Sequence, residues 1–155
     1  MSFAKLMQRF KGGVAQSDAS HTLDPLRLAT AAVLLDIGYA DGTLTTEEAS
    51  DLIGHLKQAF ELDDAMAREL IVTAEEIRSQ TIDHFALTNF IRHSASLPDR
   101  MAIVKTMWRM VYSDRKLSDY ENYLVRKLAD LLGLEHHVMI EVKVGVLQEL
   151  GLATN

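Results

Sequence analysis

Apolar residues recur at helical spacing along most of this chain, and no stretch alternates apolar with polar residues as a half-buried strand would. The most apolar stretch runs from Leu26 to Ile37, where nearly every side of a helix would be hydrophobic, so we expect a central, buried helix there. Asp24 followed by Pro25 marks its start, because aspartate caps helix N-termini and proline fits the first helical position. A second buried helix is predicted around Trp108.

Five amphipathic stripes predict the other helices of the body. They lie at about residues 45–60, 62–77, 85–93, 118–132 and 135–150. The fold class is therefore predicted to be all-α, a compact bundle of about seven to eight helices. We assign residues 1–22 to an arm and linker, and residues 23–155 to the helical domain.

One unit, made of a helix, an acidic turn and a second helix, occurs twice in this sequence. The two copies centre on Tyr39–Glu48 and Tyr112–Glu121. The matching pairs are Tyr39 and Tyr112, Asp41 and Asp114, Leu44 and Leu117, Thr45 and Ser118, and Glu48 and Glu121. We therefore expect the bundle to be built on a duplicated helix–acidic turn–helix unit, with its copies related by a pseudo-two-fold axis.

The first turn resembles half of a calcium-binding EF-hand loop. Asp41, Gly42 and Glu48 have the spacing of the later loop positions. Ile37 and Tyr39 stand where the first two oxygen ligands belong, and neither supplies a carboxylate. The second copy departs further from the pattern, so neither turn is predicted to be an ordinary EF-hand.

Two interpretations of the acidic turns remain open. In the first, Asp41, Glu48, Asp114 and Glu121 converge between the two copies, and water completes a site for Ca²⁺, Mg²⁺ or Mn²⁺, which prefer hard oxygen ligands. Arg115 beside Asp114 weakens that case for the second copy. In the second interpretation the glutamates close capping boxes, and the aspartates serve only in turns, where aspartate is common.

The N-terminal arm is predicted to be a short basic amphipathic helix. Its apolar face consists of Phe3, Leu6, Met7 and Phe10, with Lys5, Arg9 and Lys11 around it. Gly12 and Gly13 end it. The arm either folds back on the domain or anchors the protein to a membrane surface or a partner.

Charge is spread unevenly along the chain, whose net charge is −6. Residues 36–64 contain eight acidic residues and a single base, Lys57. Such an acidic region disfavours nucleic acid and oxyanions and suits a cation or a basic partner surface. The absence of cysteine excludes disulfides and thiolate chemistry. Residues 1–11 lack the continuous apolar core of a signal peptide, so we expect a cytoplasmic protein, or one at the inner face of the membrane if the arm is an anchor.

The sequence contains none of the motifs expected of an enzyme. Its six histidines have no metal-ligand spacing, and we expect them at the surface or at helix caps. No nucleophile motif or glycine-rich phosphate loop is present. Several basic residues are interleaved with acids, so we expect them to form a surface of mixed charge. They are Arg92, Arg100, Arg109, Arg126 and Lys127.

Four stretches together resemble the TerB-like proteins, in order and over about residues 24–150. They are Tyr39–Glu48, Asp83–Ile91, Arg100–Asp114 and Tyr120–Gly133. The resemblance is greatest to the short, single-domain bacterial branch of the family. It implies a compact all-helical fold, a link to tellurite resistance and membrane-associated stress response, and metal sensing or binding. A similar domain occurs fused to J-domain co-chaperones on membranes.

The resemblance places the family's acidic turn residues on Asp41, Gly42 and Glu48, and on Asp114 and Glu121. We therefore predict a non-enzymatic module of the stress-response or tellurite-resistance type, binding a divalent cation at its acidic turns and a protein partner. The alternative is a peripheral membrane adaptor that docks through its basic arm. Tellurite binding itself is not predicted, because an acidic region offers no oxyanion site.

Overall fold

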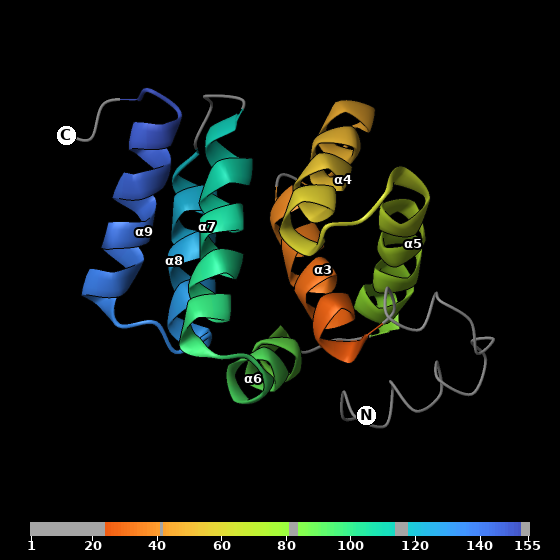
Figure 1. Cartoon of the computed structure of the whole chain (residues 1–155), viewed down its shortest axis with the longest axis horizontal. Coiled ribbons are helices and arrows are strands. Elements are labelled where there is room, and N and C mark those ends of the chain that lie inside the picture. The colour runs from red at the N-terminus through yellow and green to blue at the C-terminus, as the bar shows by residue number, and fades with distance from the viewer. Residues whose placement is uncertain (1–23, 41, 81–83, 114–117, 153–155) are drawn as a thin grey trace.

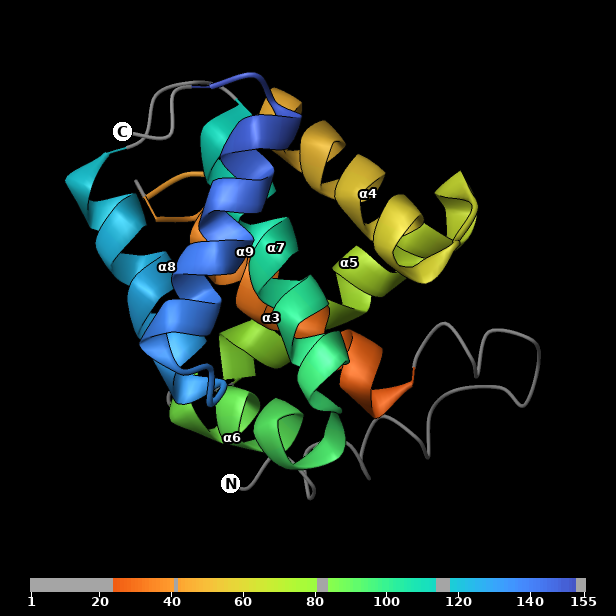
Figure 2. The same cartoon turned by 60° about the vertical axis from the view of Figure 1, so that its left-hand side comes forward.

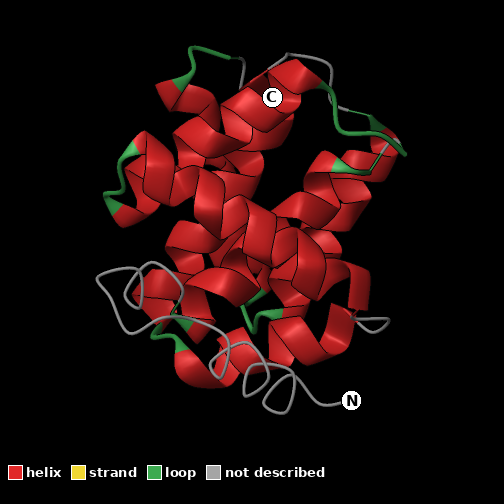
Figure 3. Cartoon of the chain, turned by 90° about the vertical axis from the view of Figure 1, so that its right-hand side faces the viewer, coloured by secondary structure: helices red, strands yellow, loops and turns green. Residues whose placement is uncertain are grey.

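The computed structural model describes residues 24–40, 42–80, 84–113 and 118–152. Within these ranges the chain forms seven α-helices and no strand, which confirms the predicted all-α class (Figures 1 and 3). The helices are α3 (Pro25–Gly38), α4 (Thr46–Phe60), α5 (Asp64–Gln80), α6 (His84–Ser94), α7 (Leu97–Ser113), α8 (Asp119–Leu131) and α9 (His136–Glu149). The arm with Phe3, Leu6, Met7 and Phe10 lies outside the described residues.

Helix α3 is the central helix of the bundle, as its all-round apolar sequence predicts. Every residue from Leu28 to Gly38 is buried. The helix packs against α4, α5, α6, α7 and α8, and it lies between the other helices in both views (Figures 1 and 2). Its start is fixed locally, because the Leu26 N–H donates to Asp24 Oδ2 at 3.1 Å and Pro25 occupies the first turn.

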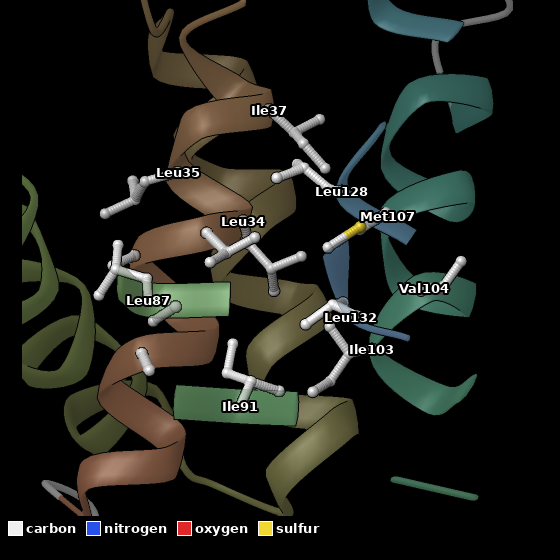
Figure 4. Packing of buried hydrophobic residues seen from close by; sticks show 14 of the residues in the cluster. Leu34, Leu35, Ile37, Leu87, Ile91, Ile103, Val104, Met107, Leu128 and Leu132 are labelled. Atoms are coloured by element: carbon white, nitrogen blue, oxygen red, sulfur yellow. The ribbon is translucent and has the colours of Figure 1, made fainter. Parts of the chain in front are cut away.

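Helix α7 is the second buried helix, and Trp108 on it is fully buried. Between α3 and α7 the core is filled by aliphatic side chains of α3, α7 and α8, among them Ile37, Met107 and Leu128 (Figure 4). Helix α6 crosses one end of the bundle (Figure 1). Its Leu87 and Ile91 are buried beside α3 (Figure 4). The core therefore runs continuously through both predicted helix pairs.

Helix α9 packs mainly on α7 and only lightly on α8. The Arg109 guanidinium donates two hydrogen bonds of 2.8 Å to the Glu149 carboxylate, and Lys105 lies 3.7 Å from the same group. The hydrogen bond from Arg109 is the main reason that the pKa of Glu149 is lowered. On the inner side Lys143 lies over the Trp108 ring at 5.0 Å, and burial lowers the pKa of its amine.

A buried carboxylate interrupts the apolar surface of α3. Asp36 is only 8% exposed, and its Oδ1 accepts a 2.7 Å hydrogen bond from Arg78 Nε of α5. The Arg78 guanidinium also stacks on Tyr39 at 4.4 Å from the ring centre, and the Tyr39 hydroxyl donates to Glu75 at 3.2 Å. This network ties the last turn of α3 to α5, and the apolar pattern alone did not predict it.

Replacing Arg78 with methionine should test the buried ion pair. The variant leaves the Asp36 carboxylate in its buried position without the guanidinium, so we expect the free energy of unfolding to fall by about 2 kcal/mol. This is below the usual cost for a fully buried pair, because the Arg78 side chain is 32% exposed. Urea denaturation followed by circular dichroism would measure the change.

Arg68→Met on the same helix is the matched control. Arg68 forms an i,i+4 pair with Asp64, and both side chains are more than half exposed. We expect its free energy of unfolding to stay close to that of the unmodified protein. Equal losses in the two variants would contradict a special role for the Asp36–Arg78 pair.

The Arg109–Glu149 pair should make stability depend on acid pH. The folded-state pKa of Glu149 is lowered, so the contribution of the pair is fully present above the unfolded value of about 4.3 and disappears as pH falls through the folded pKa. Because the Glu149 side chain is exposed to solvent, we expect Glu149→Gln to cost only a few tenths of a kcal/mol at pH 7, and the cost should shrink as pH falls through the folded-state pKa of Glu149. Urea denaturation at several pH values, with Glu141→Gln on the same helix as control, would measure this.

Candidate functional site

The turn between α3 and α4 folds back over the end of α3. The Gly42 N–H donates to the Tyr39 carbonyl at 2.8 Å. The backbone angle φ of Gly42 is +100°, a left-handed conformation that favours glycine. Leu44 then packs against Gly38, where an added Cβ would lie 2.8 Å from Leu44 Cδ1. Glycine at position 38 therefore lets the turn approach the end of the buried helix closely.

Hydroxyl caps begin both helices that follow the acidic turns. The Glu48 N–H donates to Thr45 Oγ1 at 3.1 Å, and the Glu121 N–H donates to Ser118 Oγ at 3.0 Å. Ser118 and Glu121 complete a capping box, since the Ser118 N–H donates back to the Glu121 carboxylate at 3.4 Å. In the first copy the Glu48 carboxylate accepts from the Thr45 hydroxyl instead, at 3.0 Å, so only half of the predicted box is present.

The two helix–turn–helix units meet at a small cavity of about 50 Å³. We call it the acidic cavity, because its polar lining includes three carboxylate residues, Glu48 and Asp51 from α4 and Glu121 from α8. The rest of the described lining consists of Ile37, Gly38, Leu52, Met110, Val111 and Ser113. No basic side chain of the described chain lines this cavity.

Two of the four predicted ligands, Glu48 and Glu121, thus lie on one cavity. The other two, Asp41 and Asp114, lie outside the described residues. Asp51 was not predicted, although it follows Glu48 by three residues and therefore shares its helix face. Among the described residues no three histidine, aspartate or glutamate side chains form a ready metal-binding group.

His55 lies one turn after Asp51 on α4 and is half-buried. The sequence predicted it at the surface or at a helix cap, so that prediction is wrong for His55. Burial is the main cause that lowers the pKa of its imidazole, and nearby Arg109 lowers it further. The Asp51 carboxylate acts in the opposite direction. His55 is therefore neutral at pH 7 and adds no positive charge beside the acidic cavity.

A family model described as tellurite resistance protein TerB matches residues 27–144, well over half of the chain. The chain belongs to the TerB family. The match begins in α3 and ends within α9, so both units of this TerB-family chain and its acidic cavity fall inside it. A search of curated proteins and a search of solved structures each found no match.

Within the described ranges no helix is both long and apolar enough to span a bilayer.

Two variants at the start of α8 should distinguish the stability contributed by the capping hydrogen bond from that contributed by the Glu121 charge. Ser118→Ala removes the N-cap of α8, so we expect the free energy of unfolding to fall by about 1 kcal/mol. Glu121→Gln should change it by less than about 0.5 kcal/mol, because glutamine also serves in a capping box. Thermal and urea denaturation would measure both. A loss in Glu121→Gln as large as in Ser118→Ala would mean that the charge itself holds the turn.

Proposed function

We propose that this TerB-family chain is a non-catalytic binding module that holds one divalent cation in its acidic cavity and contacts a protein partner in a bacterial stress response. One observation carries the cation part. Glu48 and Glu121, one from each helix–turn–helix unit, line the same cavity together with Asp51. The cytoplasmic location that we propose rests on the sequence.

Electrostatics supports a cation in this cavity. The three carboxylates that line this small space repel one another. A divalent cation would relieve the repulsion, and oxygen ligands are those that Ca²⁺, Mg²⁺ and Mn²⁺ prefer. In the proposed site Asp41 and Asp114 add oxygens from the two turns, and water completes the shell.

The size of the cavity also favours an ion. A volume of about 50 Å³ holds an ion with a few waters, whereas pockets for organic ligands have about 300–1,000 Å³. A cation between α4 and α8 would link the two units, so a partner that touches both could distinguish the loaded from the empty protein.

Calorimetric titration with Ca²⁺, Mg²⁺ and Mn²⁺ tests the cation. We expect one ion per chain with a dissociation constant of about 10⁻⁴–10⁻³ M, because the protein supplies few oxygen ligands to the ion. At a hundred times that concentration the ion should raise the free energy of unfolding by about 2.7 kcal/mol, which thermal denaturation would detect. The double variant Glu48→Gln/Glu121→Gln should lose both the heat and the thermal shift.

Glu47→Gln/Asp119→Asn is the matched control. It removes the same charge from the first turns of the same two helices. Glu47 and Asp119 are both exposed, and neither lines the acidic cavity. The control should bind the ion as the unmodified protein does. If no cation produces heat or a thermal shift, or if both double variants respond alike, the acidic cavity is not a cation site.

A further inference from the structure

A groove lies between α8 and α9, and it shares no lining residue with the acidic cavity. It has a volume of about 440 Å³, within the range of ligand sites. The groove exists because α9 packs mainly on α7 and stands away from α8. Its apolar floor is formed by Leu134 and Met139, which are 5% and 4% exposed. We call it the α8/α9 groove.

The rim of the α8/α9 groove is basic. Arg126 and Lys127 are both exposed, and neither forms an ion pair with a carboxylate in the described part of the chain. Lys143 lies close enough to Arg126 for the two positive charges to repel. Asp130 is the one acidic side chain among the described lining residues. Two exposed cations that have no carboxylate partner among the described residues favour an acidic ligand at this rim.

An aromatic ring and an amide add to the same groove. Tyr123 is 57% exposed, and Lys127 Nζ lies 6.0 Å from its ring centre. Exposed tyrosine and arginine are enriched at protein interfaces. Asn122 Oδ1 is buried without a hydrogen-bond partner among the described residues. Rotation of that amide would let it bond to the backbone of a bound segment.

We infer that the α8/α9 groove binds a short acidic segment of a partner protein that carries a large apolar side chain. The apolar side chain packs on Leu134 and Met139, and the flanking carboxylates pair with Arg126 and Lys127. This inference rests on the partner-binding half of the proposed function and not on its cation half.

Other occupants fit less well. A lipid acyl chain would lie against the polar side chains of Asn122 and Asp130, and a nucleic acid would meet a chain of net charge −6. The basic arm of a second copy has the wrong charge for this rim.

A neighbouring hollow gives the segment room to continue. It has about 350 Å³, shares Asp130 and Leu134 with the α8/α9 groove, and extends to Phe85 and Arg92 of α6. Phe85 is 56% exposed although it belongs to the apolar pattern that predicted this helix. An exposed aromatic ring and an arginine thus recur along the path of the proposed segment.

Fluorescence anisotropy with a labelled synthetic peptide tests the inference. The probe has a central Phe and Leu flanked by Asp and Glu, and EDTA is present so that cation binding plays no part. We expect saturable binding that weakens with added salt. Arg126→Glu/Lys127→Glu should weaken it by about tenfold or more, which corresponds to about 1.4 kcal/mol for each tenfold.

Lys57→Glu/Arg68→Glu is the matched control, because it makes the same charge change on α4 and α5, away from the groove. It should bind the probe within about twofold of the unmodified protein, after a common salt correction. A probe with Ser in place of Phe and Leu should bind at least about tenfold more weakly. The amide signals of α8 and the start of α9 should shift in a ¹H–¹⁵N spectrum with the first probe.

Three results would overturn the inference. They are equal binding by the two double variants, equal binding of the two probes, and amide shifts confined to other helices. Binding of anionic lipid vesicles that Arg126→Glu/Lys127→Glu abolishes, without any binding of the peptide, would assign the groove to a membrane instead. None of these results would affect the cation titration, so the two proposals fail separately.

Discussion

The burial of α3 is the constraint on which the rest of the structure depends. Its residues from Leu28 to Gly38 are all buried, and each large aliphatic side chain removed from water contributes about 1.5–3 kcal/mol. A helix that is apolar on every side must be covered on every side, and α4 to α8 provide that cover. The same burial makes Asp36 depend on Arg78, because a carboxylate inside the core needs a partner. It also draws the ends of α3 and α7 together, which places the acidic cavity where the two units meet.

Local features of this fold were predictable from sequence, and features that join distant segments were not. The starts of α3, α4 and α8 follow from Asp24, Thr45 and Ser118, because capping involves only neighbouring residues. Asp51 also had a local signal, its three-residue spacing from Glu48. The choice of Arg78 as the partner of Asp36, across 42 residues, depends on how α5 packs on α3. The α8/α9 groove depends in the same way on α9 packing on α7 in preference to α8, which no sequence pattern records.

Capping and cation binding need not exclude one another at the acidic cavity. An ionised carboxylate offers about four lone-pair sites over two oxygens. In the capped turns Glu48 Oε1 accepts from the Thr45 hydroxyl, and Glu121 Oε1 accepts from the Ser118 N–H and hydroxyl, so these bonds restrain each carboxylate. Side chains held in place by a cap lose less conformational entropy when they bind a ligand than freely rotating ones. The caps would therefore hold these glutamates in place for the proposed cation as well as ending the turns.

Helix α8 is a wall of both sites, since Glu121 lines the acidic cavity and the next residue, Asn122, lines the α8/α9 groove. A helix moves largely as a rigid body, so a shift that suits a ligand at one end is transmitted to the other. Any free energy of coupling between two such sites is reciprocal: a segment that binds more tightly to the loaded protein must tighten the hold on the ion by the same factor. If both proposals hold, the two proposed sites would therefore be coupled through α8, whose adjacent residues Glu121 and Asn122 line one site each.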